Sequence, residues 1–162
     1  MALYSVTNTS AASPTQTNVA AAPGKTMLQV AATTTSGRGY VYEFEIGADG
    51  LPNPTDCPIV WHALAQTTSG TGGVAMTANP LDPADVATRM VNLGNFTAEP
   101  TGVSTTIKWS LGANQRASYR WVVNPGGPGE LVFPQTNLNG IGIRAQSSTY
   151  LSTASVCLFY RE

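Results

Sequence analysis

Charged side chains are scarce in this sequence. Lysine, arginine, aspartate and glutamate make up 10% of its 162 residues, whereas a soluble domain usually carries about 25%. The basic residues occur singly and the net charge is -1, so no cluster of cations is available to neutralise several phosphates. No apolar run approaches the ~20 residues of a membrane-spanning helix. The sequence therefore predicts neither a nucleic-acid partner nor a membrane partner.

Groups that usually carry catalysis are equally few. His62 is the sole histidine, and its apolar neighbours indicate a packed, structural histidine rather than a general base. Glu43 and Glu45 would lie about 6.5–7 Å apart on one strand, which fits an inverting glycosidase pair. The same spacing is more often the solvated face of an edge strand. We expect that the protein is not an enzyme, and we assign no catalytic residue.

The cysteines and the acidic residues form no recognisable metal motif. Asp49, Asn53 and Asp56 share one loop, but they lack the spacing and the terminal glutamate of an EF-hand. Cys57 and Cys157 form either a disulfide or two buried thiols. The first residues lack the basic and apolar segments of a secretory signal, which favours the thiols of a chain folded in a cytoplasm. We expect no metal ion and no cofactor.

Short segments of alternating apolar and polar residues occur along most of the chain, separated by many of its 16 glycines and 11 prolines. In residues 40–46, three aromatic residues and an isoleucine alternate with Val41, Glu43 and Glu45, which predicts one buried face and one solvated face. With no alternation of strands and helices, this pattern predicts an all-β fold, an antiparallel, jelly-roll-like β-sandwich. The other predicted strands are residues 27–30, 59–65, 105–111, 118–123, 130–133, 140–145 and 155–160.

The apolar positions of these strands predict the core. Only residues 83–90, with Asp82 as the N-cap, favour a short helix. This segment belongs to a long excursion over residues 66–101, which we expect to serve a function or to pack against a partner. The side chains expected to be largely buried, in the protomer or in an oligomer interface, are Tyr42, Phe44, Trp61, Ile107, Trp109, Trp121, Ile141, Ile143 and Leu158.

Five short segments follow one another along the chain: Lys25–Val30, Phe44–Gly50, Phe96–Gly102, Arg120–Gly127 and Asn139–Ala145. In this order they resemble a family of small virion structural proteins of tailed bacteriophages and prophages, similar in role to head decoration or cement proteins. The resemblance covers roughly residues 24–162. It implies a β-sandwich that binds a capsid shell, often as an oligomer, without catalytic residues.

The expected function is therefore that of a viral structural protein, a bacteriophage capsid decoration or cement protein that binds the outside of the head shell and stabilises it. We expect two partners, the major capsid protein lattice and copies of the chain itself, with a trimer favoured. The expected location is the exterior of the virion, after synthesis in the host cytoplasm. The alternative is a carbohydrate- or receptor-binding β-sandwich module of a tail fibre or baseplate, which would expose a row of aromatic side chains.

The beginning of the chain differs from the rest, because most of its residues are small or polar and none is charged. We divide the chain into an N-terminal arm, residues 1–23, and a single β-sandwich domain, residues 24–162. Leu3, Tyr4 and Val6 alternate like one strand, and a lone strand needs a sheet edge to complete its hydrogen bonds. We predict that the arm is extended and docks on a neighbouring protomer or the shell, with these three residues at the interface. A disordered tail without contacts is the alternative.

Overall fold

The protein is built from short β-strands, as the alternating segments predict. The structure, a computed structural model, describes residues 1–9, 18–102 and 106–162. Within these residues there is no α-helix, and so no helix long and apolar enough to cross a membrane. The strands are β1 (Leu3–Thr7), β2 (Lys25–Ala31), β3 (Gly39–Ala48), β4 (Pro58–Gln66), β5 (Val74–Ala75), β6 (Ala78–Pro80), β7 (Val91–Gly94), β8 (Ile107–Asn114), β9 (Tyr119–Val122), β10 (Leu131–Phe133), β11 (Gly140–Gln146) and β12 (Ala154–Arg161).

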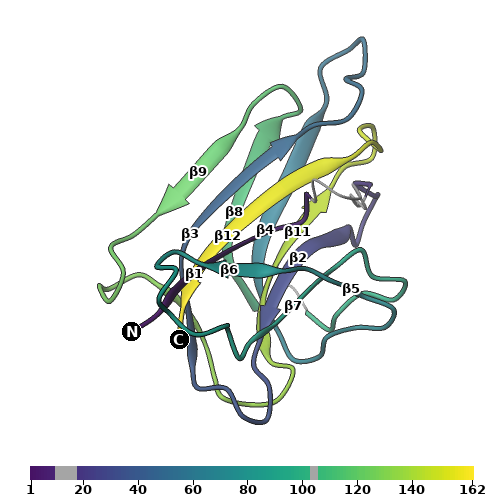
Figure 1. The fold of residues 1–162 in the computed structure, drawn as a ribbon. Coiled ribbons are helices and arrows are strands. Elements are labelled where there is room, and N and C mark those ends of the chain that lie inside the picture. The colour runs from purple at the N-terminus through teal and green to yellow at the C-terminus, as the bar shows by residue number, and fades with distance from the viewer. Residues whose placement is uncertain (10–17, 103–105) are drawn as a thin grey trace.

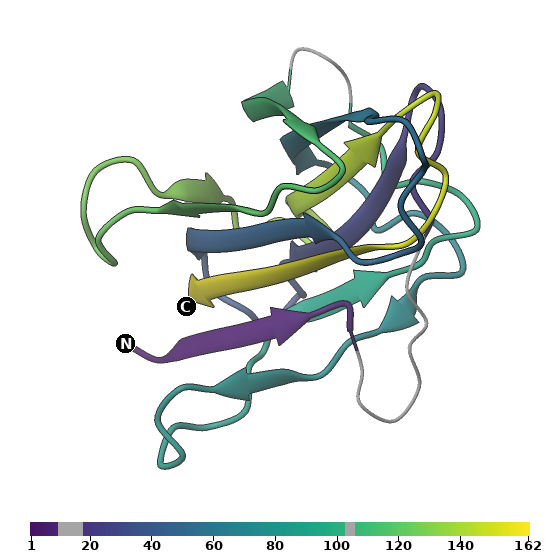
Figure 2. The ribbon, with the colours of Figure 1, turned by 90° about the horizontal axis from the view of Figure 1, so that it is seen from above.

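The strands form two antiparallel sheets that pack face to face (Figures 1 and 2). The first, which we call the β12 sheet, has the order β10-β3-β12-β1-β6, and β9 also pairs with β3. The second, the β11 sheet, has the order β5-β7-β2-β11-β4-β8. Because β9 pairs with residues 43–46 of β3 and β10 with residues 39–41, these two short strands share one edge position.

The connections between the sheets are those of a jelly roll. Strands β1, β12, β3 and β9 lie in that order in one sheet, and β2, β11, β4 and β8 lie in that order in the other. Each strand of the first set is thus followed or preceded along the chain by a strand of the second, which gives two interlocked Greek keys. The predicted antiparallel, jelly-roll-like β-sandwich is confirmed. The short strands β5, β6 and β7 extend the sheets beyond this framework.

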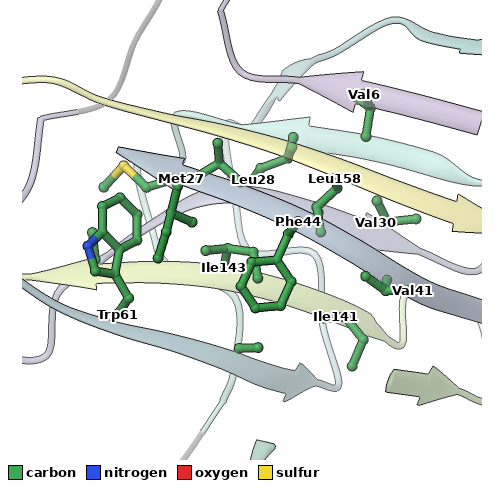
Figure 3. Close-up of a cluster of buried hydrophobic side chains, with 14 of the residues drawn as sticks. Val6, Met27, Leu28, Val30, Val41, Phe44, Trp61, Ile141, Ile143 and Leu158 are labelled. Carbon is green, nitrogen blue, oxygen red and sulfur yellow. The ribbon is translucent and has the colours of Figure 1, made fainter. Parts of the chain in front are cut away.

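The hydrophobic core fills the space between the two sheets (Figure 3). Phe44 of β3, Trp61 of β4 and Ile143 of β11 are at most 2% exposed, and each large apolar side chain buried in this way contributes roughly 1.5–3 kcal/mol. The core prediction is confirmed for Tyr42, Phe44, Trp61, Ile141, Ile143 and Leu158. Ile107, Trp109 and Trp121 are only partly buried, because they lie on strands β8 and β9 at the margins of the sheets.

A β-bulge changes the predicted faces of β3. Glu43 pairs with Phe159 of β12 and Val41 with Tyr160, so Tyr42 is the additional residue between them. As a result Val41 joins the core together with Phe44, whereas the uninterrupted alternation predicts Val41 on the solvated face. The sequence also predicts that both Glu43 and Glu45 are solvated. Glu45 is exposed as expected, but Glu43 is buried.

The excursion over residues 66–101 contains the short strands β5, β6 and β7 and no helix over residues 83–90, so the helix prediction is wrong. Asp82 accepts hydrogen bonds from the backbone of Ala84 and Asp85, as expected of a turn. Beyond this turn the backbone bonds to other parts of the molecule: the Val86 carbonyl accepts from the Tyr4 hydroxyl, and the Arg89 amide donates to the Glu162 carboxylate. These long-range bonds replace the bonds of a helix.

Candidate interaction surface on strands β8 and β9

The predicted interface residues Leu3, Tyr4 and Val6 lie on β1, which pairs with β12 and β6 of the same chain. Tyr4 and Val6 are 0% and 2% exposed, and the Tyr4 ring stacks on Tyr160 with 5.4 Å between centroids. This corrects the predicted interface at Tyr4 and Val6, because the sheet edge that β1 needs is supplied within the protomer. Leu3 is partly exposed and lies on the opposite face of β1.

Strands β8 and β9 are two of the strands that lie at a sheet edge. Within the described residues, β8 pairs only with β4, and β9 pairs only with β3. Edge strands of this kind present unpaired backbone N–H and C=O groups to a partner. Both strands lie on the same side of the sandwich, one in each sheet (Figure 1). We call the side chains Trp109, Tyr119 and Trp121, on the core side of these strands, and Val122, on the opposite face of β9, the β8–β9 surface.

A row of aromatic rings leads from the core to this surface. Phe44, which is 0% exposed, stacks on Trp121 at 5.0 Å and meets Trp109 edge-on at 4.9 Å. Trp109 in turn lies 5.6 Å from Tyr119, which is 41% exposed. Such ring pairs stabilise one another beyond their buried area. The β8–β9 surface is therefore held rigidly by the core while part of it remains open to solvent.

Acidic and basic side chains meet on the outer face of β9. Arg120 of β9 donates a 2.6 Å hydrogen bond from Nε to Glu43, and Glu45 lies 3.6 Å from the same nitrogen. Both carboxylates of the supposed glycosidase pair thus share one guanidinium. Next to them Val122 is 52% exposed. The outer face of β9 therefore offers one exposed apolar side chain beside a cluster of one guanidinium and two carboxylates.

The other residues considered for chemistry are dispersed. No group of three or more His, Cys, Asp or Glu residues that could hold a metal ion occurs in the described part of the chain. In the loop that contains Asp49, Asn53 and Asp56, Asp56 pairs with Arg116 at 2.8 Å, and Asn53 donates to the Thr149 carbonyl. Cys57 and Cys157 are free thiols, so the disulfide is not formed.

The alternation of Trp109 and Trp121 with polar residues predicts that both are buried, but alternation does not show whether a strand lies at a sheet edge. The β8–β9 surface combines two free strand edges, a row of rings packed on the core and the neighbouring ion pairs of Arg120. It is suited to contact with another protein or with the flat face of a sugar ring. Among known proteins, no family model, no curated protein and no solved structure matches this chain.

Proposed function

We propose that this protein is a viral structural protein, a bacteriophage decoration protein that binds the outside of the head shell and stabilises it as a homo-oligomer. The observation that carries the proposal is the β8–β9 surface, where Tyr119 and Val122 are 41% and 52% exposed on the two faces of β9, an edge strand of a jelly roll. A jelly roll also forms many viral capsid domains. The proposal assigns no catalytic reaction to the chain.

The composition of the chain supports the same role. Only 10% of its residues are charged, and threonine and serine lose less side-chain entropy on close packing than lysine and glutamate. Shallow contacts of many copies with a lattice then reinforce one another through avidity. The major capsid protein is the lattice we propose, and a trimer is the oligomer we favour.

Sedimentation of the full chain tests self-association. We expect a trimer for the wild type and a shift toward monomer for the double variant Tyr119→Ser, Val122→Ser. Leu51→Ser is the matched control, because Leu51 is 85% exposed but lies in the β3–β4 loop. A wild-type protein that stays monomeric at every concentration contradicts self-association through this surface.

Immunogold labelling tests the location. Antibodies against the chain should decorate the heads of particles produced from the genome that encodes it. Labelling of tail fibres or baseplates would contradict the head location and favour the second candidate below. Particles without any label would contradict a virion role altogether.

The second candidate is a carbohydrate- or receptor-binding module of a tail fibre or baseplate. It is favoured by the row formed by Trp109, Tyr119 and Trp121, because partly exposed rings offer faces on which sugars stack. Titration with neutral oligosaccharides, followed by tryptophan fluorescence, separates the two candidates. Saturable quenching that is lost in Tyr119→Ser supports the sugar-binding module, and no change in fluorescence rejects it.

A further inference from the structure

A hollow of about 430 Å³ lies on the outer face of the β11 sheet, away from the β8–β9 surface. Arg144 and Gln146 of β11 and His62 and Leu64 of β4 line it, together with Ile107 of β8. Arg144 is directly opposite His62 in the ladder between the two strands. The side chains on β4 and β11 alternate with core residues, so they project from the sheet on the side opposite the core. Ile107 is on the same side because a bulge in β8 pairs it with Leu64.

Arg144 is a buried cation whose hydrogen-bonding capacity is largely unused. The residue is 7% exposed, and a guanidinium has five N–H donors. To the described part of the chain it donates one hydrogen bond, from Nη2 to the Pro100 carbonyl at 3.1 Å. Its Nε has no partner among the described residues. A buried charge without compensation is costly, so this arrangement is suited to an incoming anion.

The acidic side chains of the described residues do not supply an anion for Arg144. Within the described residues no carboxylate forms an ion pair with Arg144. Glu99 is near enough to act on the Arg144 charge, but it pairs with Lys25 at 3.2 Å and accepts a 2.6 Å hydrogen bond from the Thr26 amide. The guanidinium therefore retains one positive charge for a ligand.

His62 leaves this charge unchanged near neutral pH. Burial, and then the neighbouring Arg144 charge, lower the pKa of its imidazole below the usual 6.5, so the ring is neutral at pH 7. Its Nδ1 has no partner among the described residues. A hollow with one net positive charge matches a singly charged anion better than a doubly charged phosphate.

We propose that this hollow binds a carboxylate group, with Arg144 as its anchor and Leu64 and Ile107 in contact with the adjoining carbon atoms of the ligand. The planar guanidinium matches a carboxylate in a two-bond geometry. Such a group comes either from a free small acid or from an acidic side chain of a bound protein. The proposal is independent of the role proposed for the β8–β9 surface.

Nuclear magnetic resonance of the full chain distinguishes the two sources. The free acid is represented by glucuronate, with glucose as its neutral match. The side chain is represented by the peptide acetyl-Gly-Glu-Gly-amide, with acetyl-Gly-Gln-Gly-amide as its match. We expect at least one of the acids to shift the Arg144 Nε–H signal in a saturable way, and its neutral match to leave that signal in place. Absence of such a shift with both acids would overturn the proposal.

Three variants locate the binding. Arg144→Gln should weaken binding of the active acid at least about tenfold, because it removes a charged hydrogen-bonding partner. Arg38→Gln makes the same change at an exposed arginine beyond the far end of β2 and should leave binding intact. Ile107→Trp keeps Arg144 but fills the hollow, so it should also weaken binding. It serves as the deciding variant if Arg144→Gln does not fold. Undiminished binding in the folded variants would refute the site.

Discussion

At the scale of single residues, some of the few charges of this chain form specific pairs. Arg161 of β12 donates from Nε and Nη2 to the two carboxylate oxygens of Glu130, at 2.8 and 2.6 Å. The Glu130 side chain is only 4% exposed. The same guanidinium lies 3.8 Å from the centroid of the Tyr40 ring. This contact ties the loop before β10 to the end of β12.

Acid titration tests this pair. Hydrogen bonding from Arg161 lowers the pKa of Glu130 below 4.5 in the folded protein, so the unfolded chain takes up a proton at higher pH than the folded one. The stabilisation is therefore complete above pH 4.5 and is lost as the pH falls through the folded pKa. We expect Glu130→Gln to lower the free energy of unfolding at pH 7, and the difference from wild type to shrink in acid.

The exposed pair of Arg116 with Asp56 is the control for this experiment. Its side chains are 52% and 62% exposed, so solvent screens their attraction. Asp56→Asn should change the free energy of unfolding less than Glu130→Gln when both are measured by urea denaturation. Equal effects of the two variants would contradict a special role of the Glu130 pair.

The thiol of Cys157 should react slowly at neutral pH. Burial, followed by the charges of Glu45 and Glu43, raises its pKa from 9.0 to about 11, and only the thiolate is nucleophilic. Alkylation by iodoacetamide, measured by mass spectrometry of the Cys157 peptide, should accelerate about tenfold per pH unit between pH 8 and 10. Glu45→Gln should accelerate it at fixed pH. A rate that levels off near pH 9 would contradict the raised pKa.

The two tryptophans Trp61 and Trp109 should differ in their contribution to stability. Trp61 is 2% exposed, so Trp61→Ala should cost about 3–5 kcal/mol of unfolding free energy. From the sequence the same cost is expected for Trp109, but its partial exposure now predicts a smaller loss. Urea denaturation of both variants provides the comparison, and a larger loss for Trp109→Ala would place its ring in the core.

At the scale of elements, strand β1 is the main departure from what the sequence predicts. It is paired on both sides, with β12 and with β6, and its inward side chains belong to the core. From the sequence, deletion of residues 2–22 is expected to leave the isolated fold near its original stability. The structure predicts a marked loss, because the deletion exposes the edge of β12 and leaves a void between the sheets.

Single substitutions on β1 show whether its side chains pack in the core, without shortening the chain. Tyr4→Ala should lower the midpoint of urea unfolding markedly, since Tyr4 is 0% exposed. Leu3→Ala changes the neighbouring, partly exposed residue and should have a small effect, as surface substitutions usually do. Comparable effects of the two would show that Tyr4 is not packed in the protomer.

Alternation locates strands that have one face in the core, such as residues 155–160 within β12. It does not identify the strands with which each strand pairs, although the pairing decides which residues are buried. The solvated face of β3 is mispredicted because the bulge at Tyr42 depends on its register with β12. The place of β1 is missed because its partner is at the other end of the chain.

The candidate sites are missed for the same reason. The β8–β9 surface is exposed because β8 is an edge strand of one sheet and β9 is an edge strand of the other. The hollow depends on Arg144 and His62, which lie far apart in the sequence but opposite each other on neighbouring strands.

At the scale of the whole molecule, the two sheets share one core, so neither is expected to persist without the other. Thermal unfolding followed by far-ultraviolet circular dichroism should show a strand-dominated spectrum that is lost in one cooperative transition. Tryptophan fluorescence should report the same midpoint, because Trp61 lies between the sheets. Two separate transitions, or a helix content near about a third, would contradict the sandwich.

The position of the last two strands has a consequence for biosynthesis. β11 lies between β2 and β4, and β12 lies between β3 and β1. While the ribosome is still making residues 140–161, neither sheet has its central strand, and the strands already synthesised expose edges open to aggregation. The nascent chain must therefore stay soluble until translation of both strands is finished. Its abundance of threonine and serine and its lack of long apolar runs disfavour aggregation of the incomplete chain as well as of the folded protein.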